Sequence, residues 1–327
     1  MTNFPNGLAS MGVPVMGMMT QGNSYFVAPR TGNDGNTGKT MQAPLKTVAA
    51  ALALATANQN DVIYLVAEGN TAANTTDYQS TTLIWNKDGV HLIGINGNPR
   101  MGHRSRIALI STYDTASNLM TVSANGCYFA NLEIFEGVAG TNPTGCLKVT
   151  GVRNHFQNCQ IAGIGNNAND IADAYSVALI GNASENYFEK CVIGCDTIAR
   201  GSAANSEIYV ATLAGARAAR NIFENCVING WCESAGNYTF LSAASGSIDR
   251  YMLFKDCAFI NPGASVAGGA AMTYAMIVTS ANGKVVLHNT SITGAADVAD
   301  NPGTVVSNAP VVGAATDLSI TQVVTKT

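Results

Sequence analysis

The amino-acid sequence predicts an all-β solenoid of about seven or eight coils, in which each coil is one structural repeat. A short motif, Phe-Gln-Asn-Cys-Gln-Ile at 156–161, recurs at fairly regular intervals. Inside each repeat apolar and polar residues alternate with a period of two, which is typical of strands with one buried face. Charged residues make up only 12% of the chain, against about a quarter in ordinary globular proteins.

The motif starts with an apolar residue, and six copies align on it. These residues are Phe129, Phe156, Phe188, Phe223, Phe254 and Leu287, so the spacings are 27, 32, 35, 31 and 33 residues. A fixed motif with a variable remainder at this period indicates stacked coils. Neighbouring coils are then expected to pair their strands in parallel, about 4.8 Å apart.

Within the motif the alternation slips by one residue, and the residue that interrupts it is often asparagine. It is Asn131, Asn158, Asn225 and Asn289 in four copies, and Lys190 and Asp256 in two others. Asparagine tolerates left-handed backbone. We therefore expect a sharp bend between two strands here, and a ladder of asparagines along the solenoid.

The residue after the bend is a cysteine in four successive coils: Cys159, Cys191, Cys226 and Cys257. The alternation places these side chains inside, which predicts a buried column of thiols that act as small apolar fillers.

Each coil is expected to contain a second strand, and loops are inserted between some of the coils. The second strands are expected at 120–122, 147–149, 177–179, 209–211, 240–242 and 277–279, and the insertions at 165–174, 195–206, 230–237 and 261–273. Such insertions emerge on one side of a solenoid and often form its binding face.

The pattern divides the chain into four segments. Residues 1–22 form an uncharged arm, 23–61 a first strand, a Gly-rich loop and a capping helix with Pro44 in its first turn, 62–294 the solenoid, and 295–327 a C-terminal cap or tail. Proline is favoured at the start of a helix. The helix is expected to close the open end of the stack.

The arm carries apolar side chains but is too short to bury them by itself. They are Phe4, Leu8, Val13, Val15, Met16 and Met18. We expect this docking arm to lie against another subunit or a partner protein.

The segments 25–29, 32–38, 43–48 and 61–65 follow one another as a strand, a Gly/Asn/Asp loop, a helix and a strand. This order resembles the start of right-handed parallel β-helix proteins, and the asparagine bend resembles the ladder of pectate-lyase-like β-helices. The resemblance covers about residues 24–295 and implies that fold, but one fold hosts many activities. The arm, with Asn-Phe-Pro-Asn-Gly at 3–7, resembles structural proteins of tailed bacteriophages.

Enzymes of this fold cleave polysaccharides, and hydrolysis needs two carboxyl groups about 5–9 Å apart. Asp170 and Asp173 share one inserted loop and Glu207 flanks the next, so they are the catalytic candidates. The motifs of pectin-cleaving hydrolases are missing, and we interpret these acids as solvated loop residues. The sequence indicates no cofactor, and the scattered His residues and lack of a Cys-x-x-Cys pair argue against a metal site.

The net charge of −4 includes no basic stripe, which argues against nucleic-acid binding. The longest apolar run, 48–55, is too short to span a membrane. No Lys or Arg precedes Arg30, so a secretory signal peptide is not expected.

The resemblance implies a non-enzymatic virion protein, assembled in the host cytoplasm. We expect a capsid decoration or cement protein that forms a homotrimer and docks on a capsid protein. A tail spike or fibre that binds or depolymerises host-surface polysaccharide remains the alternative.

Overall fold

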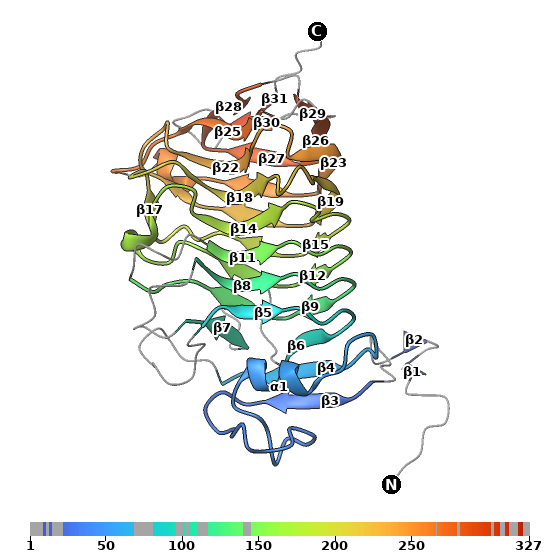
Figure 1. Ribbon diagram of the computed structural model, residues 1–327. Coiled ribbons are helices and arrows are strands. Elements are labelled where there is room, and N and C mark those ends of the chain that lie inside the picture. The colour runs from blue at the N-terminus through green and yellow to red at the C-terminus, as the bar shows by residue number, and fades with distance from the viewer. Residues whose placement is uncertain are drawn as a thin grey trace.

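The protein is an all-β parallel solenoid with very little helix, as the repeat predicts (Figure 1). The computed structural model describes residues 22–68, 81–95, 101, 105–109, 117–139, 145–265, 267–279, 282–301 and 304–307. Outside these ranges it describes the backbone of β1 (Ala9–Ser10), β2 (Val13–Pro14), β30 (Val311–Gly313) and β31 (Ile320–Gln322).

Three long sheets form the walls, and the chain visits them in the order sheet A, sheet B, sheet C. Sheet A contains β5 (Leu83–Trp85), β8 (Asn118–Val122), β11 (Gly145–Val149), β14 (Tyr175–Ile180), β18 (Asn205–Ala211), β22 (Tyr238–Ala243), β25 (Met272–Val278) and β28 (Ala295–Ala299). Sheet B contains β3 (Ser24–Val27), β4 (Val62–Val66), β6 (His91–Ile95), β9 (Tyr128–Ala130), β12 (His155–Gln157), β15 (Tyr187–Glu189), β19 (Ala218–Glu224), β23 (Ile248–Lys255), β26 (Gly283–His288) and β29 (Val305–Ser307).

Sheet C is formed by the strands that follow the bend. They are β7 (Arg106–Ala108), β10 (Glu133–Phe135), β13 (Gln160–Ala162), β16 (Val192–Ile193), β20 (Val227–Asn229), β24 (Ala258–Ile260), β27 (Ser291–Thr293), β30 and β31. Within the three sheets the described pairs are parallel, except that β31 runs antiparallel to β30.

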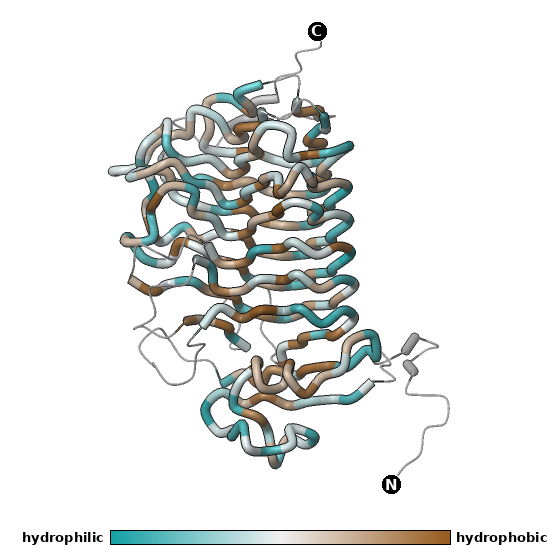
Figure 2. The backbone as a smooth tube through the Cα atoms, viewed as in Figure 1, coloured by the Kyte–Doolittle hydropathy of each residue, from teal (hydrophilic) through white to brown (hydrophobic). Residues whose placement is uncertain are grey.

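The repeated motif forms a buried aromatic column inside sheet B. The rings of Phe129, Phe156, Phe188, Phe223 and Phe254 stack with successive centroid distances of 4.8, 4.7, 4.6 and 4.7 Å. Each ring is fully buried, and stacked aromatic pairs contribute about 0.5–1.5 kcal/mol beyond the burial of their area. Figure 2 shows hydrophobic segments recurring at the same place in successive coils.

The helix α1 (Val48–Leu54) starts later than the sequence predicts. The side chain of Thr47 accepts a hydrogen bond from the amide of Ala50 and caps the helix. Pro44 cannot lie in the first turn, because Leu45 pairs with Val27 as an extended residue. On α1 Val48, Ala51 and Leu52 are buried in the core.

The predicted second strands are wrong by one residue in three coils. The predicted strands start at residues 209, 240 and 277. In the structure Val177 aligns instead with their neighbours Ile208, Leu241 and Met276. Both faces of sheet A are largely buried, as in β14 and β22. Apolar residues therefore run almost continuously along these strands, and the alternation that fixes the facing is lost.

Candidate functional site

The inserted loops lie together along the edge of sheet A where the chain arrives from sheet C (Figure 1, at the left). They contain two short 3-10 helices, η1 (Asn167–Asn169) and η2 (Pro262–Ser265). They also contain β17 (Ala199–Arg200) and β21 (Trp231–Cys232), which pair in parallel. The candidate acids lie at this edge.

Glu207 is fully buried, although the sequence predicts a solvated acid. It forms an ion pair with Arg200, whose side chain is also fully buried. Ser176 donates a hydrogen bond of 2.5 Å to one carboxylate oxygen of Glu207, and Tyr238 donates one of 2.7 Å to the other. The carboxylate is thus bound on both oxygens by groups from β14, β17 and β22.

Burial raises the pKa of Glu207, and the Arg200 charge with the hydrogen bonds from Ser176 and Tyr238 opposes that rise. The guanidinium carbon lies 5.2 Å from the centroid of the Tyr238 ring. Among the described residues Nε and Nη2 of Arg200 have no hydrogen-bond partner. This closed charge pair has no surface on which a polymer could bind.

Asp170 holds two neighbouring loops together. Its carboxylate accepts hydrogen bonds from the amides of Gly201 and Ser202 at 2.9 and 2.8 Å and from the side chain of Asn205 at 2.6 Å. Asp170 is only 7% exposed, whereas Asp173 is exposed. The interpretation as solvated acids is therefore wrong for Asp170 and Glu207, because the loops fold back over sheet A.

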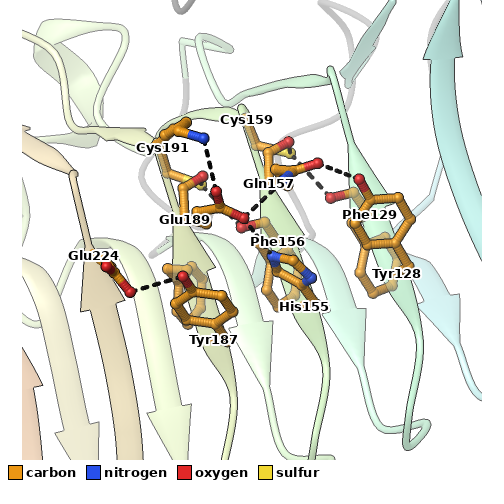
Figure 3. Close-up of polar contacts among 12 residues, drawn as sticks. Tyr128, Phe129, His155, Phe156, Gln157, Cys159, Tyr187, Glu189, Cys191 and Glu224 are labelled. Atoms are coloured by element: carbon orange, nitrogen blue, oxygen red, sulfur yellow. Dashed lines mark hydrogen bonds and ion pairs between the residues drawn. The ribbon is translucent and has the colours of Figure 1, made fainter. Parts of the chain in front are cut away.

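A second cluster, shown in Figure 3, lies on the outer face of sheet B. The ring of His155 lies between those of Tyr128 and Tyr187, at centroid distances of 5.2 and 4.7 Å. Each residue is half-buried. Because these rings pack on one another, their faces are in contact within the row and cannot stack on a sugar.

The polar groups beside this row bond to one another as well. Gln157 donates a hydrogen bond of 2.7 Å to Glu189, and Tyr187 donates one of 2.8 Å to Glu224. Burial would raise the pKa of Glu189, but hydrogen bonds from Lys190 and Gln157 lower it. Burial lowers the pKa of His155 while Glu189 opposes the change. We call these residues the outer row: Tyr128, His155, Gln157, Tyr187, Glu189 and Glu224. Their side chains bond to one another and stabilise the stacking of coils.

The predicted bend has left-handed backbone in every copy of the motif. The φ angles are 56° at Asn131, 50° at Asn158, 53° at Lys190, 54° at Asn225, 53° at Asp256 and 47° at Asn289. Asn158 donates a side-chain hydrogen bond of 2.8 Å to Asn131. Asn225 and Asn289 are exposed, so this ladder lies at the surface.

A buried asparagine ladder, which the sequence analysis missed, lies at the opposite end of the sheet B strands. The amide of Asn154 donates to the side chain of Asn186, and the amide of Asn186 donates to the side chain of Asn221, both at 3.0 Å. All three are at most 1% exposed. The sequence contains a signal for this ladder, because each of the three asparagines lies two residues before the motif phenylalanine.

The thiol column lies inside the solenoid. Cys159, Cys191, Cys226 and Cys257 are at most 3% exposed. All eight cysteines are free, and Cys195 is the one that is partly exposed. Burial is the first cause of the raised pKa of Cys191 and Cys226. The thiols of Cys191 and Cys226 are therefore neutral and poor nucleophiles.

Within the part of the chain that the structure describes, no three His, Cys, Asp or Glu side chains are grouped to hold a metal ion. Among the described residues no helix has both the length and the apolar character that crossing a membrane requires. The arm residues Phe4, Leu8, Val15, Met16 and Met18 lie outside the described residues, and for Val13 only the backbone is described.

Comparison with known proteins finds neither a matching family model nor a matching curated protein. Solved structures do match. The pectate lyase Pel9A has a TM-score of 0.56 and 16% identity, over 85% of this chain and 64% of the lyase. The pectin methylesterase PemA from Erwinia chrysanthemi has a TM-score of 0.43 and 15% identity, over 88% of this chain and 81% of that one.

The likeness to the pectate lyase shows the fold alone, because so low an identity carries no site residues across. This chain spans 64% of the lyase's length. The protein is thus a pectate-lyase-like parallel β-solenoid.

Proposed function

We propose that this protein is a non-enzymatic structural protein of a tailed-phage virion, of the capsid decoration or cement kind. The observation that supports it best is the burial and hydrogen bonding of the candidate catalytic acids. Glu207 and Asp170 are buried and bonded, which leaves Asp173 as the exposed one of the three. Paired catalysis needs two accessible carboxyl groups across one sugar.

The proposal includes a homotrimer in which residues 1–22 dock on a neighbouring subunit or on a capsid protein. The solenoid at 62–294 is right-handed, with about seven or eight coils. The segment 23–61 closes its N-terminal end through α1, and 295–327 closes the other. No nucleic acid, membrane or cofactor takes part, and the virion assembles in the host cytoplasm.

Deleting residues 2–22 tests the docking role of the arm. The solenoid core begins at Tyr25, so the thermal midpoint should stay within a few degrees of the full chain's. Incorporation into particles, measured by co-sedimentation with virions, should be lost. Normal incorporation of the truncated chain would show that the docking surface lies elsewhere.

The alternative is a tail spike or fibre that binds or depolymerises host-surface polysaccharide. The observation that favours it is the outer row, in which Tyr128, Gln157 and Glu224 are partly exposed and carry a hydroxyl, an amide and a carboxylate group. Incubation with capsule or lipopolysaccharide should release no reducing ends and no unsaturated sugars. Release that Asp173→Asn abolishes would favour the spike.

A further inference from the structure

The two edges of sheet A carry opposite charge, although the sequence shows no stripe of either sign. One edge is the turn from sheet A into sheet B, and the other holds the inserted loops. In Figure 1 the strands of sheet A lie between β17 on the left and the strands of sheet B on the right.

At the turn into sheet B, successive coils place long charged side chains at the same position. Arg153, Glu185, Arg220 and Arg250 have φ angles of 58°, 58°, 55° and 66°. This left-handed conformation favours glycine or asparagine, and other residues there cost about 1 kcal/mol or more. The chain accepts that cost in four coils, so the charged side chains have a role at this edge.

These side chains extend into solvent. The side chains of Arg153, Arg220 and Arg250 are 70%, 40% and 63% exposed. Arg153 and Arg220 share the carboxylate of Glu185, and Arg250 lies 3.7 Å from Asp249. Exposed Arg217 and Lys284 lie at the same turn. We call these five cations the cationic edge: Arg153, Arg217, Arg220, Arg250 and Lys284. The carboxylates of Glu185 and Asp249 reduce its net charge to +3.

A β-bulge adds an aromatic side chain to the cationic edge. Ala219 pairs with Asp249 and Asn221 with Met252, so Arg250 and Tyr251 both lie opposite Arg220. Tyr251 is 37% exposed. Bulges commonly re-aim side chains at functional surfaces, and Arg and Tyr are enriched at the energetic centre of protein interfaces.

The edge formed by the inserted loops is acidic. Asp173, Asp196 and Glu233 are exposed there. The four loops contain one basic residue, Arg200, and its charge is buried against Glu207. We call the three exposed acids the acidic edge.

The two edges match in the coils of β18 and β22, whereas Asp173 shares its coil with Glu185, whose carboxylate pairs with Arg153 and Arg220. Asp196 lies in the inserted loop that leads through β17 to β18, and Arg217 and Arg220 follow β18 in the same coil. Glu233 lies just before β22, and Arg250 follows in the same coil. Two copies with parallel axes therefore bring acids and arginines together at the same height, with the same rise of about 4.8 Å per coil.

We propose that these edges bind each other between copies of this chain. The acidic edge of one subunit packs against the cationic edge of the next, side by side and with parallel axes. Because the two surfaces differ, the contact is head-to-tail, and a threefold axis parallel to the solenoids closes three such contacts into the ring of the proposed homotrimer. This rests on the self-association in the proposed function and names its contact residues.

Charge reversal on each edge tests the contact. In low salt the wild-type chain should sediment as an oligomer. Arg220→Glu with Arg250→Glu should reduce the mass to that of one chain, 33.8 kDa. Asp196→Lys with Glu233→Lys should do the same. Mixing the two double variants should restore association, because one then has two acidic edges and the other two cationic edges.

A control with Lys39→Glu and Lys190→Glu makes the same change in net charge as the arginine double variant, away from both edges, and it should keep the wild-type mass. Thermal midpoints of all variants report whether they fold. A wild-type oligomer that neither double variant alters would refute these edges and leave the proposed self-association standing. A wild-type chain that is monomeric at every concentration and salt would refute both.

Discussion

The thiol of Cys191 donates a hydrogen bond of 3.4 Å to the carbonyl oxygen of Phe156, one coil earlier. Cys226 and Cys257 do the same to Phe188 and Phe223 at 3.3 and 3.4 Å. The column continues with Thr290, whose hydroxyl donates to Phe254 at 3.1 Å. From Cys159 to Thr290 the position thus holds a small side chain that donates a hydrogen bond, through sulfur or oxygen, whereas Leu132 fills it in the first copy of the motif.

Replacing Cys226 by threonine should cost only about 1 kcal/mol of unfolding free energy, because the hydroxyl can replace the thiol as donor. Cys226→Asp should cost on the order of 3 kcal/mol or more, because an unpaired carboxyl group would enter the core. Denaturant unfolding of both variants measures the two costs. Equal costs would mean that the side chain does not point inward.

Native labelling with a thiol reagent should modify one thiol per chain rapidly. That thiol is Cys195, which is partly exposed, while the other seven are buried. Unfolding in denaturant should make all eight react. Cys195→Ser should remove the fast phase, and a fast phase that survives this change would show that a coil opens under native conditions.

Glu207→Gln should destabilise the protein by about 3–5 kcal/mol, because it leaves the Arg200 charge buried without its partner. Arg200→Met with Glu207→Leu should recover part of the loss, since neither charge then needs solvation. Asp173→Asn serves as the control and should change stability by less than about 0.5 kcal/mol, because this side chain is exposed. Urea unfolding of the four chains measures each value.

The motif sheet could be predicted from the sequence, because its side chains alternate between core and solvent. Phe156 is fully buried while His155 and Gln157 are half-buried, so the period of two is visible. The predicted strands of sheet A were displaced by one residue in three coils, because both faces of strands such as β14 and β22 are largely buried and the alternation is lost. The strand predicted at 209–211 is therefore displaced by one residue, because Ile208 is the residue that aligns with Val177.

The buried pair was hidden for a related reason. Arg200 lies in an inserted loop and Glu207 in a strand, and nothing in their spacing indicates a contact. Their approach depends on how the loop folds over sheet A, which the repeat does not specify. The outer row was more accessible to prediction, since Tyr128, His155 and Tyr187 occupy one position of the aligned motif.

Asn186→Ala should destabilise the protein by about 3 kcal/mol, because it leaves the Asn154 amide and the Gly151 carbonyl without their partner. Asn225→Ala, at the exposed bend, should cost only about 1 kcal/mol, the strain of alanine in left-handed backbone. Asn225→Gly should relieve that strain. Similar losses for the two alanine variants would contradict the difference between the buried and the surface ladder.

Glu136 should make the stability depend on pH. Burial raises the pKa of Glu136 to about 7, although a hydrogen bond from the amide of Val138 lowers it somewhat. The ordinary value in an unfolded chain is 4.5, so the folded state holds the proton more tightly. The contribution of Glu136 to stability is then largest below pH 4.5, falls as the pH rises to about 7, and is constant above.

Glu136→Gln removes this titration and keeps an oxygen for the Val138 amide. The variant should therefore gain stability relative to wild type by about 3 kcal/mol between pH 4.5 and pH 8, in proportion to the raised pKa. Urea unfolding of both chains at several pH values measures the difference and cancels the titration of all other groups. A difference that stays constant with pH would show that the Glu136 carboxyl is solvated in the folded state.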